Sequence, residues 1–245
     1  MSKKYELVVD DTITFWGWKL FRIKALISFG SVDAGDLGGY IYTEDNLSQK
    51  GDAWVWGNAK VSGNAKVWGN AEVWGNAEVW GNAKVSGNAE VSGNAEVSGN
   101  AEVSGNAEVW GNAKVSGNAK VSGNAEVWGN AEVWGNAEVW GNAKVSGNAE
   151  VWGNAEVWGN AEVWGNAEVS GDAKVSDFED VIVFKNHWSS GRHFTYTKSN
   201  KMWRVGCFYG TGQELIDKAY RDSEKSGNYY KAYVEFIASL EGLGE

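Results

Sequence analysis

A single six-residue unit fills the middle of this sequence and limits what the chain can fold into. From Gly51 to Ser176, 126 residues divide into 21 consecutive copies of Gly-Asn-Ala-[Glu/Lys]-Val-[Trp/Ser], without one insertion. A period of six does not match the 3.6-residue turn of an α-helix. In an extended backbone, Ala and Val point to one side, and Glu/Lys and Trp/Ser point to the other. Each unit therefore predicts one short strand whose Ala and Val side is buried.

The Gly-Asn pair predicts a bend between successive strands. Glycine adopts the positive φ that a sharp corner often demands, and asparagine is among the few other residues that tolerate it. Three strands and three corners close a triangular coil of 18 residues, so the 21 units make seven coils. At about 4.8 Å per coil, the rod is about 34 Å long. The predicted fold class is mainly β, a three-sided parallel β-helix.

The Ala-x-Val-x-Gly-Asn spacing resembles the hexapeptide-repeat family, whose members form left-handed parallel β-helices. The left hand is implied by this resemblance, because right-handed crossovers are the general expectation. Two flanking segments, VDAGDLGGYIYTEDNLSQKGDAWVW and RVGCFYGTGQELIDKAYRDSEKSG, also resemble hexapeptide-repeat proteins associated with phages and enterobacteria. The resemblance implies a phage-associated branch of the family, and it specifies a fold rather than an activity.

Two aspartates mark where the rod is expected to end. Asp replaces the corner Asn only in the first and last units, at Asp52 and Asp172. A carboxylate cannot donate an amide hydrogen bond and repels a copy of itself one coil away, so Asp fits where a ladder of stacked Asn side chains stops. We therefore expect three parts: residues 1–50 as an N-terminal β cap with a degenerate first coil, 51–176 as the β-helix, and 177–245 as a small C-terminal α+β cap.

The flanks are expected to cap the open strand edges of the rod. Strands are predicted at 5–9, 19–28, 180–185, 193–198 and 202–208, with the last two as a hairpin. Thr211-Gly-Gln-Glu214 has the spacing of a capping box and predicts a helix that continues to about Glu224. Ser226-Gly227 predicts a break before a second helix that ends near Leu240.

The hexapeptide-repeat family is best known for acyltransferases, which use a catalytic His and a CoA or nucleotide-sugar pocket between subunits. The repeat here has no His and no extruded loop, and the two histidines, His187 and His193, follow it. Family relatives of the carbonic-anhydrase type bind zinc through three His, which two cannot supply. We expect no enzyme, no cofactor and no metal, with both histidines at the surface or packed in the cap. An acyltransferase-like enzyme is the alternative.

The charge and the single cysteine limit partners and location. The net charge of −10 argues against a nucleic acid or an anionic membrane as a partner, whereas a basic partner fits. Cys207 lies among apolar residues and is expected to be buried rather than reactive. A lone cysteine forms no internal disulfide and the start lacks the apolar core of a signal peptide, so we expect a cytoplasmic protein. No run approaches the roughly 18 apolar residues of a membrane span.

The position that holds Trp or Ser distinguishes three faces of the predicted rod. Counting every third unit gives a first face with Trp56, Trp74, Ser92, Trp110, Trp128, Ser146 and Trp164, and two further faces with three Trp each. Trp that points outward typically marks an interface. The candidate binding residues are therefore the five tryptophans of the first face, with stacked pairs expected at Trp56/Trp74 and Trp110/Trp128.

Several functions for these tryptophans stay open at this stage. The indoles can shield the glycine corners and one another, join copies of the chain as a homo-oligomer, or form a platform for sugar rings or bases. The rod carries a net charge of −8, which raises a further alternative, an acidic mimic of DNA that inhibits a host protein. Its charge density, about one per 4 Å against one per roughly 1.7 Å in DNA, disfavours mimicry. We expect a non-enzymatic structural or interaction protein that self-associates or binds a host protein or carbohydrate.

Overall fold

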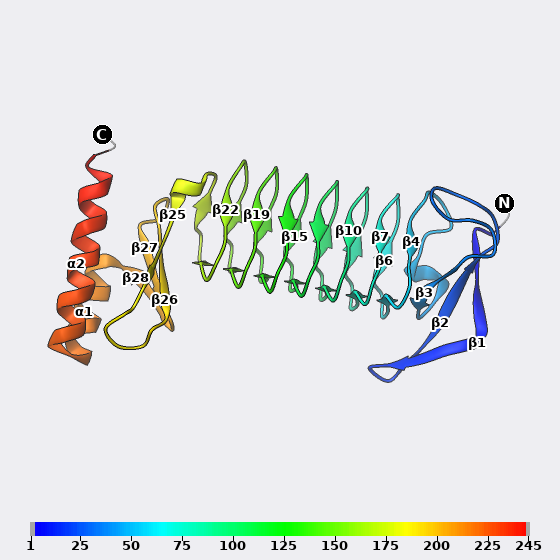
Figure 1. Ribbon diagram of the computed structural model, residues 1–245, viewed down its shortest axis with the longest axis horizontal. Coiled ribbons are helices and arrows are strands. Elements are labelled where there is room, and N and C mark those ends of the chain that lie inside the picture. The colour runs from blue at the N-terminus through cyan, green and yellow to red at the C-terminus, as the bar shows by residue number, and fades with distance from the viewer. Residues whose placement is uncertain (1–2, 244–245) are drawn as a thin grey trace.

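The computed structural model describes residues 3–243 and shows a straight rod with a cap at each end (Figure 1). The repeat forms 21 two-residue strands, which pair in parallel with the strands 18 residues away. The chain is thus a parallel β-solenoid with three sheets, and the predicted fold class is confirmed. The left-handed sense of the coil stays a prediction from the resemblance.

Each sheet of the rod carries one of the three faces. The sheet of the first face contains β4 (Trp54–Val55), β7 (Glu72–Val73), β10 (Glu90–Val91), β13 (Glu108–Val109), β16 (Glu126–Val127), β19 (Lys144–Val145) and β22 (Glu162–Val163). The second face has β5 (Lys60–Val61), β8 (Glu78–Val79), β11 (Glu96–Val97), β14 (Lys114–Val115), β17 (Glu132–Val133), β20 (Glu150–Val151) and β23 (Glu168–Val169). The third face has β6 (Lys66–Val67), β9 (Lys84–Val85), β12 (Glu102–Val103), β15 (Lys120–Val121), β18 (Glu138–Val139), β21 (Glu156–Val157) and β24 (Lys174–Val175).

The inside of the rod is filled by the Ala and Val of every unit, which are almost completely buried. Each corner glycine has a positive φ, for example +71° at Gly87. A Cβ added at Gly87 would lie 2.8 Å from the carbonyl oxygen of Gly105 in the next coil, so both the backbone conformation and the stacking distance require glycine. The corner is therefore the reason that the repeat tolerates no substitution at this position.

Stacked asparagines run along the three corners, as the sequence predicted. From Asn64 to Asn154, each corner Nδ2 donates to the corner Oδ1 one coil further on, for example from Asn100 to Asn118 at 2.9 Å. The ladder that ends at Asp172 stops with an acceptor, because Asn154 donates to the Asp172 carboxylate at 3.0 Å. At the other end, the backbone N–H of Asp52 replaces the missing amide and donates to Asn70 Oδ1 at 3.4 Å. The prediction that Asp marks the ends of ladders is confirmed.

The N-terminal cap adds a hairpin and one irregular coil to the rod. Its elements are β1 (Tyr5–Phe15), β2 (Trp18–Ala25), β3 (Leu37–Ile41) and the short 3-10 helix η1 (Glu44–Asn46). β3 pairs in parallel with β5, and Leu47 forms a parallel bridge with Val67. The degenerate first coil is therefore confirmed, and β1 and β2 extend the sheet of the second face to ten strands.

The C-terminal cap is a four-stranded antiparallel sheet that is covered by two helices (Figure 1). Its elements are η2 (Phe178–Asp180), β25 (Val181–Lys185), β26 (His193–Thr197), β27 (Met202–Val205), β28 (Phe208–Thr211), α1 (Gly212–Asp222) and α2 (Glu224–Glu241). The hairpin of β26 and β27 and the capping box at Thr211 are confirmed. Neither helix of the described chain has the length and apolar character that crossing a membrane requires.

Three local predictions in this cap are wrong. The strand expected at 202–208 is divided into β27 and β28, because Gly206 has a φ of +56° and turns the chain. Cys207 lies in this turn and is exposed, not buried. The helices separate at Ser223, whose side chain accepts from the N–H of Ser226, and Gly227 lies inside α2. Gly227 serves close packing, because an added Cβ would overlap the ring of Tyr220.

Candidate interaction site

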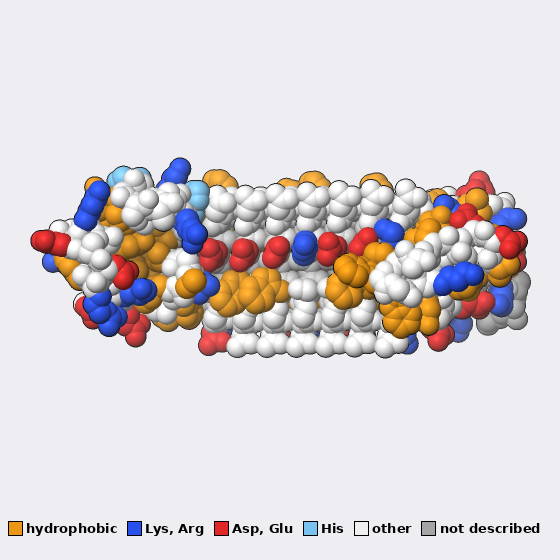
Figure 2. All heavy atoms as spheres, turned by 90° about the horizontal axis from the view of Figure 1, so that it is seen from below, with side chains coloured by type: hydrophobic (Ala, Val, Ile, Leu, Met, Phe, Trp, Pro, Cys, Tyr) orange, Lys and Arg blue, Asp and Glu red, His pale blue; other side chains and the backbone are white. Residues whose placement is uncertain are grey.

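The outward side chains of the rod form two parallel columns on each face, one of Glu and Lys and one of Trp and Ser. Figure 2 shows one charged column along the rod, with hydrophobic side chains gathered in places beside it. Six of the eleven rod indoles are half-buried, and five are more than a third exposed: Trp68, Trp74, Trp80, Trp110 and Trp164. The exposed indoles therefore lie on all three faces, with three of them on the first face.

The five predicted binding residues differ in their surroundings. Trp74 and Trp110 are exposed, Trp128 and Trp56 are half-buried, and Trp164 is the most exposed indole of the rod at 67%. Trp110 and Trp128 are stacked as predicted, with centroids 5.5 Å apart and planes 4° apart. The second predicted pair is wrong, because Trp56 meets Trp54 edge-on at 81° instead of stacking on Trp74.

Trp54 explains the environment of Trp56 and was not recognised from the sequence. It occupies the charged column, yet it is completely buried beneath the N-terminal cap, where Tyr5 and Phe29 contact its ring. Its presence in a column that otherwise holds only Glu and Lys was the available signal, since an apolar residue at an outward position indicates that something covers it.

Stacked indoles also occur on the other two faces. Trp134 and Trp152 of the second face lie 4.7 Å apart, and Trp140 and Trp158 of the third face lie 5.3 Å apart, with planes within 8° of parallel. Three of the four pairs of Trp in adjacent coils are therefore stacked, because the strand repeat holds the rings at a favourable separation, and Trp56 and Trp74 are the exception. Stacking stabilises the rod locally and does not by itself distinguish the first face.

Charge distinguishes the first face from the others. Its charged column contains Glu72, Glu90, Glu108, Glu126, Lys144 and Glu162, which is five carboxylates against one ammonium. The second face has five Glu and two Lys, and the third has three Glu and four Lys. Partial burial and the neighbouring Glu90 and Glu126 raise the pKa of Glu108 above its usual value. Glu126 pairs with Lys144, whereas Glu72, Glu90 and Glu108 form no ion pair in the described chain and make a band of negative charge beside the exposed Trp74 and Trp110.

The second face gains a cation from the C-terminal cap. The Arg204 guanidinium lies 4.6 Å from the ring centroid of Trp152 and forms an ion pair with Glu168 at 3.1 Å. The pKa of Glu150 is raised by burial and by Glu168 and Glu132, and Arg204 opposes this shift. This contact was not predictable from the sequence, because Arg204 is distant in the chain from both partners. It shows that a guanidinium fits between the indole and carboxylate columns of this rod.

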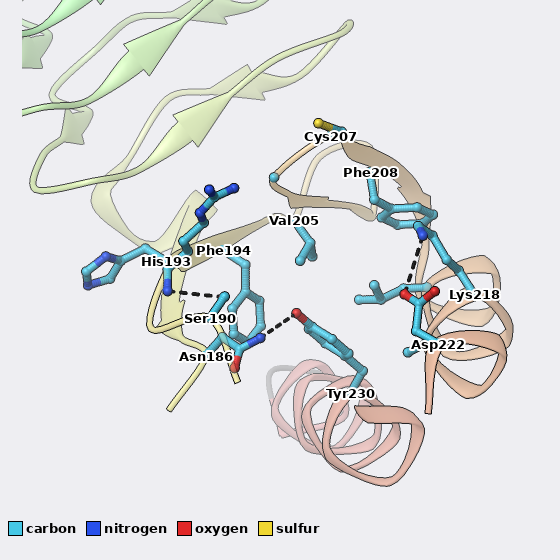
Figure 3. Close-up of a pocket in the computed structure, with 14 residues that line it drawn as sticks. Asn186, Ser190, His193, Phe194, Val205, Cys207, Phe208, Lys218, Asp222 and Tyr230 are labelled. Carbon is cyan, nitrogen blue, oxygen red and sulfur yellow. Dashed lines mark hydrogen bonds and ion pairs between the residues drawn. The ribbon is translucent and has the colours of Figure 1, made fainter. Parts of the chain in front are cut away.

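A separate hollow of about 270 Å³ lies inside the C-terminal cap, between the sheet and the helices (Figure 3). Phe194, Val205 and Phe208 line its sheet side. The hydroxyl of Tyr230 accepts a hydrogen bond from Asn186 Nδ2 at 3.1 Å, and burial raises the pKa of this tyrosine. Aromatic or aliphatic side chains and polar or charged side chains line the hollow in equal number, and Asn186 and Tyr230 are buried.

The residues with potential chemistry lie around the edge of this hollow and do not converge in it. Lys218 pairs with Asp222 at 3.4 Å, and the side chains of His193 and Cys207 point away from the centre of the view in Figure 3. His187 is exposed and packs edge-on against Tyr229. Across residues 3–243, no three His, Cys, Asp or Glu side chains are grouped as metal ligands. The outward columns of the rod are therefore the more developed candidate site.

Comparison with known proteins adds no assignment to this geometry. No known family model matches the chain, and no curated protein is found as a relative.

Proposed function

We propose that this protein is a non-enzymatic interaction module of the hexapeptide-repeat type, encoded by a phage or prophage, that binds a partner through the first face of its rod. The observation that carries the proposal is the combination of exposed Trp74, Trp110 and Trp164 with five glutamates on a rigid surface. Rigid exposed indoles bury a large area without a large loss of side-chain entropy. The phage origin rests on the resemblance of the repeat and its flanks.

The charge of the first face selects the chemistry of the partner. If two copies of the chain met through their first faces, the five glutamates of one copy would lie against the five of the other. Their repulsion opposes association at low ionic strength. A partner with exposed arginines fits better, because a planar guanidinium stacks on an indole and pairs with a carboxylate. Arg204 already makes this pair of contacts on the second face, with Trp152 and Glu168.

A second copy of the chain is the second candidate. The third face carries four Lys against three Glu and the exposed Trp68, so it can oppose the acidic first face of a neighbouring copy. Contact between two different faces is heterologous and leads to larger assemblies rather than to a closed dimer.

Peptide binding and light scattering separate these candidates. The test variant changes Trp56, Trp74, Trp110, Trp128 and Trp164 to Ser, and the control changes Trp68, Trp80 and Trp140 on the other faces. Ser already occurs at the equivalent position of other units, so both variants should fold. We expect an octa-arginine peptide to bind the wild type at least threefold more tightly than octa-lysine, and the test variant alone to lose this preference. Equal binding of both peptides to all proteins would reject an arginine-bearing partner.

Light scattering on the same three proteins tests the second candidate. A mass above that of one chain that falls in the five-Trp variant, and is unchanged in the control variant, would support self-association. One mass for all three proteins would reject it.

A further inference from the structure

The last coil of the rod is capped on two faces and open on the third. On the second face, the N–H of Glu168 donates to Thr195 Oγ1 at 2.9 Å. On the third face, the N–H groups of Lys174 and Ser176 donate to Ser199 Oγ and Asp180 Oδ2, both at 2.8 Å. These acceptors replace the carbonyls that a further coil would supply. The C-terminal cap therefore continues the ladder of the third sheet at both donor positions and that of the second sheet at Glu168, whereas the N–H of Ser170 forms no hydrogen bond within residues 3–243.

The strand β22 of the first face has no such continuation. One coil earlier, the equivalent N–H groups of Lys144 and Ser146 donate to Ala161 O and Val163 O at 2.9 Å. Within residues 3–243, the N–H groups of Glu162 and Trp164 form no hydrogen bond, and β22 pairs only with β19. A strand edge with free donors is a template for another extended chain.

The open edge faces a hollow of about 460 Å³ between the last coil and the C-terminal cap. Trp164, Phe178, Val181, Val183 and His193 line it, so its walls are mainly apolar. Trp164 and Phe178 are 67% and 65% exposed, which is unusual for side chains of this size. The chain that follows the rod thus passes beside the next strand position without filling it.

The charged column indicates which side chain belongs above Glu162. Opposite charges one coil apart form ion pairs throughout the rod, at Lys60–Glu78, Lys84–Glu102, Glu96–Lys114, Lys120–Glu138 and Glu126–Lys144, over 2.7 to 3.8 Å. Lys144 is in register with Glu162 but pairs with Glu126, and Glu162 has no ion pair in the described chain. A lysine or arginine on an added strand would therefore compensate the Glu162 carboxylate.

The aromatic column gives a second requirement. Each face has one stacked pair of indoles in adjacent coils, with centroids 4.7 to 5.5 Å apart. Trp164 follows Ser146 and has no indole after it, so neither side of its ring is stacked on a Trp of the rod. The inward residues of this unit are Val163 in β22 and Ala161 just before it, both fully buried, so an added strand must place small apolar residues inward.

We propose that β22 is a docking site for an extended segment of a partner protein, which adds to it as a parallel strand. Its carbonyls accept from the N–H groups of Glu162 and Trp164, its cationic side chain lies over Glu162, and its aromatic side chain stacks on Trp164. The segment has the pattern small–Lys/Arg–Val–aromatic and fills the hollow beside Phe178 and Val183. This goes beyond the proposed function, because it uses the end of the rod and its backbone donors rather than the length of a face.

A fluorescein-labelled peptide, acetyl-Gly-Asn-Ala-Lys-Val-Trp-Gly-Asn-amide, tests the site by fluorescence anisotropy up to 1 mM. We expect saturable binding that a scrambled peptide of the same composition lacks. Trp164→Ser should weaken binding about tenfold, whereas Trp110→Ser, in the middle of the same face, should leave it unchanged. Val183→Trp should abolish binding, because the new ring fills the hollow. Absence of binding at 1 mM, or equal loss in Trp110→Ser and Trp164→Ser, would overturn the proposal.

Exchanging the charges of Glu162 and of the peptide lysine is a control for variants that only disturb the fold. Glu162→Lys should weaken binding of the lysine peptide and strengthen binding of a peptide that has Glu in place of this Lys. Glu108→Lys, in the middle of the rod, should change neither affinity. Amide hydrogen exchange, followed by NMR, should slow at least tenfold at Glu162 and Trp164 when the peptide binds, and stay constant at Glu168. Protection elsewhere but not at these two amides would reject docking on β22. The octa-arginine preference of the first face should survive Val183→Trp, so the two proposals can fail separately.

Discussion

The two ends of the rod present opposite hydrogen-bonding groups, and each cap has the complementary chemistry. Along each face, the N–H groups at the Asn, Glu/Lys and Trp/Ser positions donate to carbonyls of the next coil, as from Lys60 to Ala77 O at 2.9 Å. The first coil is therefore left with free carbonyls at its Gly, Ala and Val positions, and the last coil with free N–H groups at its Asn, Glu/Lys and Trp/Ser positions. At these positions the rod requires donors at its start and acceptors at its end.

The N-terminal cap satisfies this requirement on all three faces. Lys4 Nζ donates to Gly51 O and Ala53 O at 3.1 and 2.8 Å on the first face. On the third face, Asn46 Nδ2 donates to Gly63 O and Ala65 O at 3.1 and 2.8 Å. On the second face, backbone N–H groups of the irregular coil donate to the carbonyls of the first coil. Lys4 and Asn46 are both nearly fully buried.

The C-terminal cap differs in burial and in completeness. Its acceptors, Thr195, Ser199 and Asp180, serve two faces, and the bonds from Lys174 and Ser176 are solvent-exposed. The N-terminal cap shares one apolar core with the rod, whereas the C-terminal cap has a core of its own around Phe194 and Trp203. The start of the rod should therefore contribute more to stability, and the open end is free to bind.

The largest effect is expected from Asn46→Ala. Asn46 donates to two carbonyls and accepts from the N–H groups of Tyr42 and Thr43 at 3.1 and 2.8 Å. Leaving these buried groups unpaired should lower the free energy of unfolding by about 4 kcal/mol, measured by urea denaturation. Asn64→Ala, at an exposed corner in the next coil, is the control and should cost less than about 1 kcal/mol. Equal losses would show that the donor cap has no special role.

The pH dependence of stability provides the next test. Burial lowers the pKa of Lys4 to about 8, although the Asp52 carboxylate opposes the shift. Between about pH 8 and the usual lysine pKa, the folded chain binds fewer protons than the unfolded chain, so stability rises with pH. We expect a gain of about 2 kcal/mol between pH 7.5 and 9.5. We limit the test to pH 9.5 because burial raises the pKa of Tyr5. Above pH 10 the folded chain therefore binds more protons at Tyr5 than the unfolded chain, and this lowers stability as the pH rises.

Lys4→Met separates this contribution from other titrations. The variant should lose the rise in stability between pH 7.5 and 9.5, measured as the change in the urea midpoint. A rise of the same size in Lys4→Met would assign the pH dependence to another group.

A smaller effect is expected at the acceptor end. Thr195→Val keeps the side-chain shape but removes the acceptor for the partly buried N–H of Glu168, and should cost about 1 kcal/mol. Ser199→Ala should cost less, because water can reach the exposed N–H of Lys174. A loss in Thr195→Val as large as that in Asn46→Ala would contradict the difference between the two caps.

The rod was predictable from its sequence because every determinant repeats within six residues. The alternation of Ala and Val, the glycine corner and the Asp in the first and last units require only local geometry and parallel stacking. The capping box at Thr211 was predictable for the same reason, since its partners are three residues apart.

The candidate site and the caps were less predictable because their contacts join distant segments. Lys4 reaches Ala53, and Arg204 reaches Trp152, across gaps that no local pattern indicates. The burial of Trp54 depends on Phe29 in the same way. Gly227 was misread because glycine serves both helix ends and close packing, and only the position of Tyr220 distinguishes these roles.

The smallest effect on stability is expected at Asp172, because the last residue of its asparagine ladder only accepts a hydrogen bond. Asn118 accepts from Asn100 and donates to Asn136, whereas Asp172 only accepts, from Asn154. Asp172→Asn keeps that acceptor and should change the free energy of unfolding by less than about 0.5 kcal/mol. Asn118→Asp removes a donor and places a carboxylate beside the Asn136 oxygen, so it should cost about 1 to 2 kcal/mol. Urea denaturation of the two variants compares the same chemical change in opposite directions, and equal effects would show that the corner amides do not act as a directed ladder.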